Sequence, residues 1–156
     1  MQQLRFLVGP SPVLNDVGLL VLRLATAVVF IAHGWVLIFD AGVSNVIQNF
    51  REAGIPLAEL SAPFTAYIEL FGGILFVLGV LTRPLSAGFV IVMAGALFFV
   101  HLGEPLVSQD GESSGLAFVL CAASIALLLA GAGRFSIDHL LAQRVAVSSR
   151  SVGTTA

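Results

Sequence analysis

Four long runs of apolar residues dominate this 156-residue sequence and constrain its fold more than any other feature. A helix needs about 20 apolar residues to cross the roughly 30 Å hydrocarbon layer of a bilayer. The runs cover residues 17–39, 62–81, 85–101 and 116–132. Because 58% of the residues are hydrophobic and 10% are charged, a water-soluble core could not absorb so much apolar surface. The sequence therefore predicts an all-α fold, a bundle of four transmembrane helices that contacts the lipid bilayer.

The connections between the runs predict how the bundle is organised. Residues 40–61 carry apolar side chains at helical spacing opposite polar ones, which is typical of a short amphipathic helix at the membrane surface. The turn at residues 82–84 is so short that the second and third spans must be antiparallel neighbours. We therefore expect an N-terminal lead at 1–16, a membrane domain at 17–138 and a disordered tail at 139–156.

The basic residues, all of them arginines, predict the orientation of the bundle. Only Arg51 falls in a connection on one side, whereas the other side carries Arg5, Arg83, Arg134, Arg144 and Arg150. By the positive-inside rule, we expect a multi-pass protein of the cell membrane with both termini in the cytoplasm. The sequence contains no basic patch suited to nucleic acid, and its single cysteine, Cys121, excludes an intrachain disulfide or a cysteine metal cluster.

Four ionisable side chains lie in or at the edges of the predicted spans, where an unpaired charge costs several kcal/mol. With a rise of about 1.5 Å per residue, His33 and Glu69 lie about 9 Å and 10 Å below the outer ends of their spans. His101 closes the third span on that same side. We therefore predict that Glu69, His33 and His101 converge as a catalytic site that handles protons. Arg23 lies about 9 Å from the cytoplasmic end, where it either reaches lipid headgroups or contacts an anionic substrate or a quinone carbonyl.

Two other interpretations of this cluster remain open. Glu69 could bond one histidine as a structural clamp, while the other histidine caps a helix at the interface. His33 and His101 could instead be axial ligands of a haem or part of a metal site. Two histidines and one carboxylate are too few to specify such a site, so we predict no bound metal.

Short motifs, in order along the chain, resemble the DoxX family of membrane proteins. They are LRL at 22–24, FIAHG at 30–34, GIP at 54–56, ELFGG at 69–73, GVLTR at 79–83, VH at 100–101 and GRFSID at 133–138. The resemblance covers residues 17–138 and implies a four-helix membrane protein. The resemblance further implies that the chain is similar to the quinone-reducing subunits of thiosulfate oxidation and to subunits of membrane-associated oxidoreductase complexes that handle sulfur and oxidative stress. It also implies functional roles for Arg23, His33, Glu69 and His101.

Two hypotheses about function follow. In the first, the chain is a quinone-linked oxidoreductase subunit: a quinone enters from the lipid, Glu69 and a histidine exchange its protons, and electrons come from a partner protein. In the second, it is a non-catalytic membrane anchor or accessory subunit that docks a protein partner through its outer loops or its tail. A transporter is a third interpretation, which would require a homo-oligomer because four spans alone do not make a pathway. We rank the first hypothesis, with quinone as the expected cofactor, just ahead of the second, and the sequence alone does not separate them.

Overall fold

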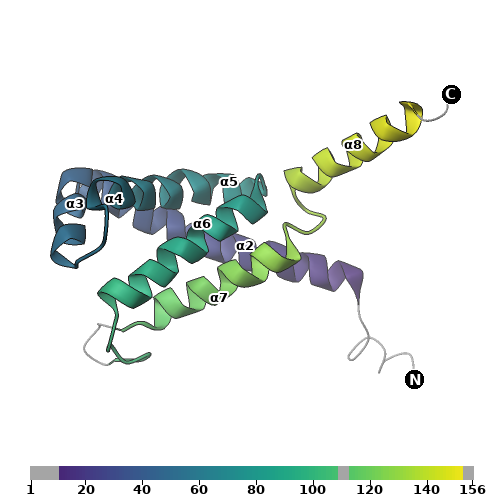
Figure 1. The fold of residues 1–156 in the computed structure, drawn as a ribbon. Helices are drawn as coiled ribbons and strands as arrows, with labels where there is room; N and C mark the ends of the chain where they lie inside the picture. Colours follow the sequence, from purple (N-terminus) through teal and green to yellow (C-terminus); the bar gives the residue numbers. More distant parts are fainter. Residues whose placement is uncertain (1–10, 109–112, 153–156) are drawn as a thin grey trace, which may run out of the picture.

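The protein is described here from a computed structural model, which covers residues 11–108 and 113–152, with the backbone alone for 146–152. Every regular element in this part of the chain is helical (Figure 1). The α-helices are α2 (Pro12–Trp35), α3 (Val43–Glu52), α4 (Ala58–Tyr67), α5 (Gly73–Leu78), α6 (Thr82–Gly95), α7 (Gly115–Ala130) and α8 (Ile137–Val152). Three π-helical turns continue or join them: η1 (Val36–Asp40), η2 (Ile68–Gly72) and η3 (Ala96–Val100).

Three continuous helices are long and apolar enough to cross a membrane: Pro12–Asp40, Ala58–Leu78 and Thr82–Val100. The apolar α7 is shorter, with 16 residues or about 24 Å of length. All four predicted runs are thus helical. The first helix begins at Pro12 rather than at residue 17, because proline fits the first turn of a helix, where its missing N–H is not needed.

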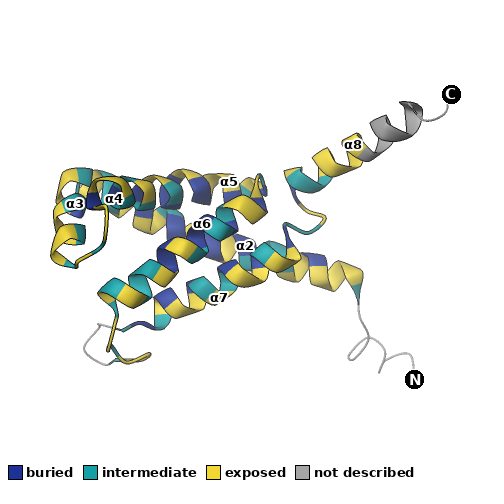
Figure 2. Cartoon of the chain, in the orientation of Figure 1, coloured by how far each residue is buried: buried dark blue, intermediate teal, exposed yellow. Residues whose placement is uncertain are grey.

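The helices pack around a small aromatic core. The rings of Phe30 (α2) and Phe89 (α6) stack with centroids 4.0 Å apart, and Phe76 (α5) meets Phe89 edge-on at 5.1 Å. All three side chains are fully buried, so three helices meet at one point. The outward faces of the same helices are exposed (Figure 2). They carry many large apolar side chains, as expected where lipid replaces water.

The predicted amphipathic helix is present as α3, which packs on α4 at one end of the bundle (Figure 1). It buries Val46 and exposes Ser44, Gln48 and Asn49. We call this end the α3 end. The opposite end, where the α5–α6 turn meets the loop between α7 and α8, is the α8 end.

The segment after Asp138 corrects an expectation, because the tail that the sequence predicts to be disordered forms α8 as far as Val152. The Oγ of Ser136 accepts the N–H of His139 at 3.1 Å and so caps the start of this helix. Residues 139–147 contain mostly good helix formers, whereas the serines that suggested disorder begin at Ser148. Residues 1–10 of the predicted lead and 153–156 of the predicted tail lie outside the described residues.

Candidate functional site

Glu69 lies at a close crossing of two long helices. It belongs to the π-helical turn η2, which α2 crosses at Gly34. A Cβ added to Gly34 would collide with the backbone nitrogen of Leu70 and lie 2.9 Å from its Cα. One step along the same crossing, a Cβ on Gly73 would lie 2.8 Å from the side chain of Ile31. The two glycines therefore allow the backbones to touch and enclose Glu69 completely, with 0% of its side chain exposed.

His33 is the hydrogen-bonding partner of this buried carboxyl group. Its Nδ1 lies 2.6 Å from the Oε2 of Glu69, which is a short and strong hydrogen bond. The side chain of His33 is 58% exposed on the outside of the bundle, so Glu69 faces the protein interior and His33 faces the surroundings of the bundle. Among the described residues, only Glu69 bonds to this ring. Nε2, the ring nitrogen opposite Nδ1, is therefore available to a ligand.

The second carboxyl oxygen of Glu69, Oε1, is buried and has no hydrogen-bond partner among the described residues. An unpaired buried polar atom costs about 1–3 kcal/mol, so such atoms are rare in native proteins. They occur at sites where a proton, a water molecule or a ligand completes the bonding. π-Helical turns such as η2 are also found frequently at functional sites.

His101 is not part of this pair. It follows the π-helical turn η3, and its Nδ1 bonds the Oε2 of Glu104 at 2.7 Å, three residues further along the chain. Both side chains are about a quarter exposed. The structure thus joins two of the three residues that the sequence predicts to converge, and it gives the third its own carboxylate. The spacing of three residues between His101 and Glu104 was the signal in the sequence that could have revealed this second pair.

Arg23 lies far from both pairs and is enclosed by protein. Ten residues of helix, or about 15 Å, separate it from His33 along α2. Its guanidinium donates to the carbonyl oxygens of Ala132 at 2.6 Å and Phe135 at 2.7 Å, and 1% of the residue is exposed. The expectation that Arg23 reaches the lipid headgroups is therefore wrong, because the loop after α7 folds back over it. Whether it also contacts a substrate stays a prediction.

The loop that Arg23 holds brings together two of the sequence motifs, at 79–83 and 133–138. The carboxylate of Asp138 accepts the N–H groups of Leu81 at 2.9 Å and Thr82 at 2.8 Å, and so caps α6. The N–H of Asp138 donates in turn to the carbonyl of Gly79 at 3.0 Å. Leu81 has a φ of 52°, a conformation that a leucine rarely adopts, and the cap stabilises it. The contacts of these motif residues hold two segments of the fold together. The motifs alone did not indicate that the two segments meet.

The described residues contain no group of three or more His, Cys, Asp or Glu side chains that could hold a metal ion. The two His–carboxylate pairs offer two donors each, which is too few for a resident metal. What the first pair can do is exchange protons: a buried carboxyl group bonded to an exposed imidazole connects the interior of the bundle to a ligand outside it.

Comparisons with known proteins agree on one family. The DoxX family model matches residues 18–102, from within α2 to the residue after His101. "Putative oxidoreductase CatD" of Bacillus subtilis is 32% identical over 79% of this chain and 86% of its own length. "Inner membrane protein YqjF" of Escherichia coli is 31% identical over 82% of this chain and 95% of its own. No solved structure matches the chain.

Proposed function

The chain belongs to the DoxX family of membrane proteins, and from this premise we propose that it is the quinone-handling subunit of a membrane oxidoreductase system, with His33 and Glu69 exchanging the protons of the quinone. The name of one relative includes the word oxidoreductase, and a second relative is named an inner membrane protein. The observation that carries the proposal is a fully buried glutamate bonded at 2.6 Å to a half-exposed histidine.

The proposal includes a complete crossing of the membrane by four helices. The three long helices satisfy the length required, and α7, which packs along α6, would be the fourth span. Its 16 residues are short for a 30 Å layer, so the apolar residues beside it or a thinner local bilayer would make up the difference. Arg83 and Arg134 lie at the α8 end and Arg51 at the α3 end. This distribution supports a cytoplasmic α8 end, with both termini inside.

The surroundings of His33 favour a ligand dissolved in the lipid. A polar ring exposed to hydrocarbon costs free energy unless something bonds it. A quinone is apolar enough to diffuse in the bilayer and has two carbonyl oxygens that accept hydrogen bonds. Its carbonyl would accept the Nε2–H of His33, while Nδ1 keeps its bond to Glu69. This arrangement would use the exposed half of the ring, for which the described residues supply no partner.

Reduction of a quinone to a quinol takes two electrons and two protons. In the proposal, a partner redox protein supplies both electrons, and the His33–Glu69 pair delivers the protons one at a time. Nε2 would give its proton to the quinone oxygen as Nδ1 takes one from the carboxyl group of Glu69, which leaves the ring neutral with its proton on Nδ1. The exposed Nε2 would then take a proton from water at the α3 end while Nδ1 returns its proton to the Glu69 carboxylate, and the pair is ready to deliver the second proton. Oxidation of a quinol would run the same steps in reverse.

Binding of quinone can be followed through Trp35, the single tryptophan of the chain, which lies two residues from His33. We expect ubiquinone-1 to quench its fluorescence saturably when the full chain is reconstituted in quinone-free lipid nanodiscs. His33→Leu should weaken the apparent affinity about fivefold to tenfold, because one hydrogen bond contributes about 1 kcal/mol or slightly more. Glu104→Gln is the matched control, since it changes the other His–carboxylate pair. Identical, non-saturating quenching in the wild type and in His33→Leu would contradict quinone binding at this site.

An accessory role is the second candidate, and the position of α8 favours it. This helix projects from the bundle (Figure 1), and its Leu140, Leu141 and Val145 are exposed by half or more. A partner protein could dock there. In that case a complex isolated in mild detergent would depend on α8, and its activity would be unaffected by His33→Leu.

A further inference from the structure

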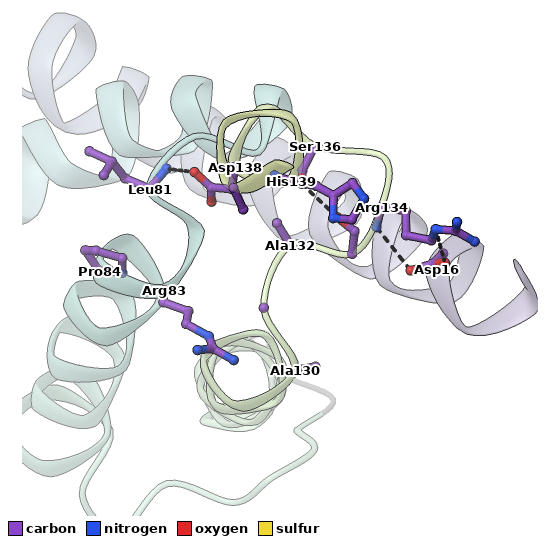
Figure 3. Close-up of a pocket in the computed structure, with 13 residues that line it drawn as sticks. Asp16, Leu81, Arg83, Pro84, Ala130, Ala132, Arg134, Ser136, Asp138 and His139 are labelled. Atoms are coloured by element: carbon purple, nitrogen blue, oxygen red, sulfur yellow. Dashed lines mark hydrogen bonds and ion pairs between the residues drawn. The ribbon is translucent and has the colours of Figure 1, made fainter. Parts of the chain in front are cut away.

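The α8 end contains a cavity of about 540 Å³ that the proton-exchange site does not use. Figure 3 shows its lining, which comes from the start of α2, the start of α6, the end of α7 and the loop and first turns of α8. The volume falls in the range of ligand sites, about 300–1,000 Å³. Its charged and titratable lining residues are Asp16, Arg83, Arg134, Asp138 and His139.

The two acidic residues in this lining are already bonded. Asp138 accepts two backbone N–H groups at the start of α6, at 2.9 Å and 2.8 Å. Asp16 is buried and accepts the backbone N–H of Arg134 at 3.1 Å, with the Nε of the same arginine 3.9 Å away. These carboxylates hold the cavity together, and their charges are offset by the donors around them.

Arg83 is in a different position. Its Nη2 donates to the carbonyl of Leu129 at 3.3 Å, which is a long bond, and no carboxylate lies within 4.0 Å of it among the described residues. An arginine carries five N–H donors in a planar fork, so most of them are unused here. In Figure 3 the guanidinium of Arg83 extends from α6 towards the end of α7, on the opposite side of the cavity from Arg134. The cavity therefore has cationic groups on two sides, and one of them, the guanidinium of Arg83, has no carboxylate partner among the described residues.

Apart from Ser136, the rest of the lining consists of apolar residues and glycines, and it lies where a membrane surface would be. The apolar part is formed by Leu81, which is half exposed, and by Pro84, Ala130, Ala132 and Ala142. The cavity lies at the ends of three apolar helices, at the level where spans pass from hydrocarbon to headgroups. A ligand with an anionic group and an apolar remainder fits this combination better than a fully hydrated ion does.

We propose that this cavity binds the phosphate group of an anionic phospholipid, with Arg83 as its main donor and Arg134 on the far side. Arginine suits this role because its fork matches the oxygens of a phosphate in a two-point contact. Basic pockets between helices at the cytoplasmic side of membrane proteins bind lipid headgroups by the same physics. The proposal does not depend on quinone binding, since His33 lies towards the other end of the bundle.

Native mass spectrometry of the full chain in a nonionic detergent tests the proposal. The probes are phosphatidylglycerol, phosphatidylcholine and inorganic phosphate. We expect one phosphatidylglycerol to be retained per chain in preference to phosphatidylcholine. Arg83→Gln should weaken its retention about tenfold, the loss expected for a charge-assisted contact. Arg144→Gln is the matched control, because it removes an equal charge from exposed α8 outside the cavity, and it should change retention by less than about twofold.

Two results would overturn the site: equal loss of phosphatidylglycerol in Arg83→Gln and Arg144→Gln, or equal retention of both lipids by the wild type. Competition with inorganic phosphate shows whether the bound anion is a lipid headgroup or a free phosphate. If equimolar phosphate does not displace the lipid, the ligand is a headgroup; if it does, the same site binds a water-soluble phosphate. Arg83→Lys, which keeps the charge but loses the fork, should retain lipid at an intermediate level, and thermal unfolding by circular dichroism confirms that each variant is folded.

Discussion

Replacing Gly34 by alanine is expected to lower the free energy of unfolding by about 2–3 kcal/mol, although the change adds one methyl group. The added Cβ would collide with the backbone of Leu70, and a backbone atom cannot move aside as a flexible side chain can. Helix α2 and the turn η2 would have to separate. The separation would also stretch the bond between His33 and Glu69, so quenching of Trp35 by ubiquinone-1 should weaken together with stability.

Gly18→Ala is the matched control for this prediction. Gly18 lies in the same helix, and a Cβ there would meet no atom within 4 Å. Alanine is the better helix former, so this variant should be as stable as the wild type or up to about 1 kcal/mol more stable. Thermal unfolding in detergent, followed by circular dichroism, measures both variants. Equal stability of Gly34→Ala and Gly18→Ala would mean that the helices do not cross as closely as described.

Replacing Arg23 by alanine is expected to lower the free energy of unfolding by about 3 kcal/mol. The change removes the donor from two part-buried hydrogen bonds to the carbonyls of Ala132 and Phe135, and each charge-assisted bond contributes about 1.5–3 kcal/mol. It also leaves a void beside Gly79, whose added Cβ would lie 2.7 Å from the Nη1 of Arg23. Burying the guanidinium cation costs free energy in the wild-type protein, and the variant no longer has this cost, which offsets part of the loss.

Arg144→Ala supplies the comparison, because this exposed arginine on α8 should contribute less than about 0.5 kcal/mol. Limited proteolysis gives a second readout, since the loop at residues 131–136 should become cleavable when Arg23 no longer holds it. An Arg23→Ala protein as stable and as resistant as Arg144→Ala would contradict the role assigned to this side chain.

The helices and the first His–Glu pair could be predicted because their signals are local. Runs of apolar residues locate the long helices, and the helical rise places His33 and Glu69 at similar depths. The glycines beside Glu69 indicate a close crossing, as the structure has it at Gly73. Depth alone, however, does not determine the direction in which a side chain points around its helix. That is why His101, at the same end of the bundle, is bonded to Glu104 instead.

The contacts at the α8 end could not be predicted, because they join residues far apart in the sequence. Arg23 bonds a carbonyl 109 residues away, and Asp138 caps a helix that begins 56 residues before it. The periodic spacing of apolar residues in a sequence does not indicate contacts between residues so far apart. The helical rise gives the distance of Arg23 from the end of its span, but it does not show that the chain folds back there and supplies its own acceptors. The cavity beside Arg83 depends on the same loop and was missed for the same reason.

Proton exchange by Glu69 is tested most directly by infrared difference spectroscopy. The full chain in nanodiscs containing ubiquinone-1 is reduced and reoxidised electrochemically, and the carboxyl C=O stretching region is recorded. We predict a reversible carboxyl signal that disappears in Glu69→Gln and persists in Glu104→Gln. A spectrum that is the same in the wild type and in Glu69→Gln would show that this buried carboxyl group takes no part in the chemistry of the quinone.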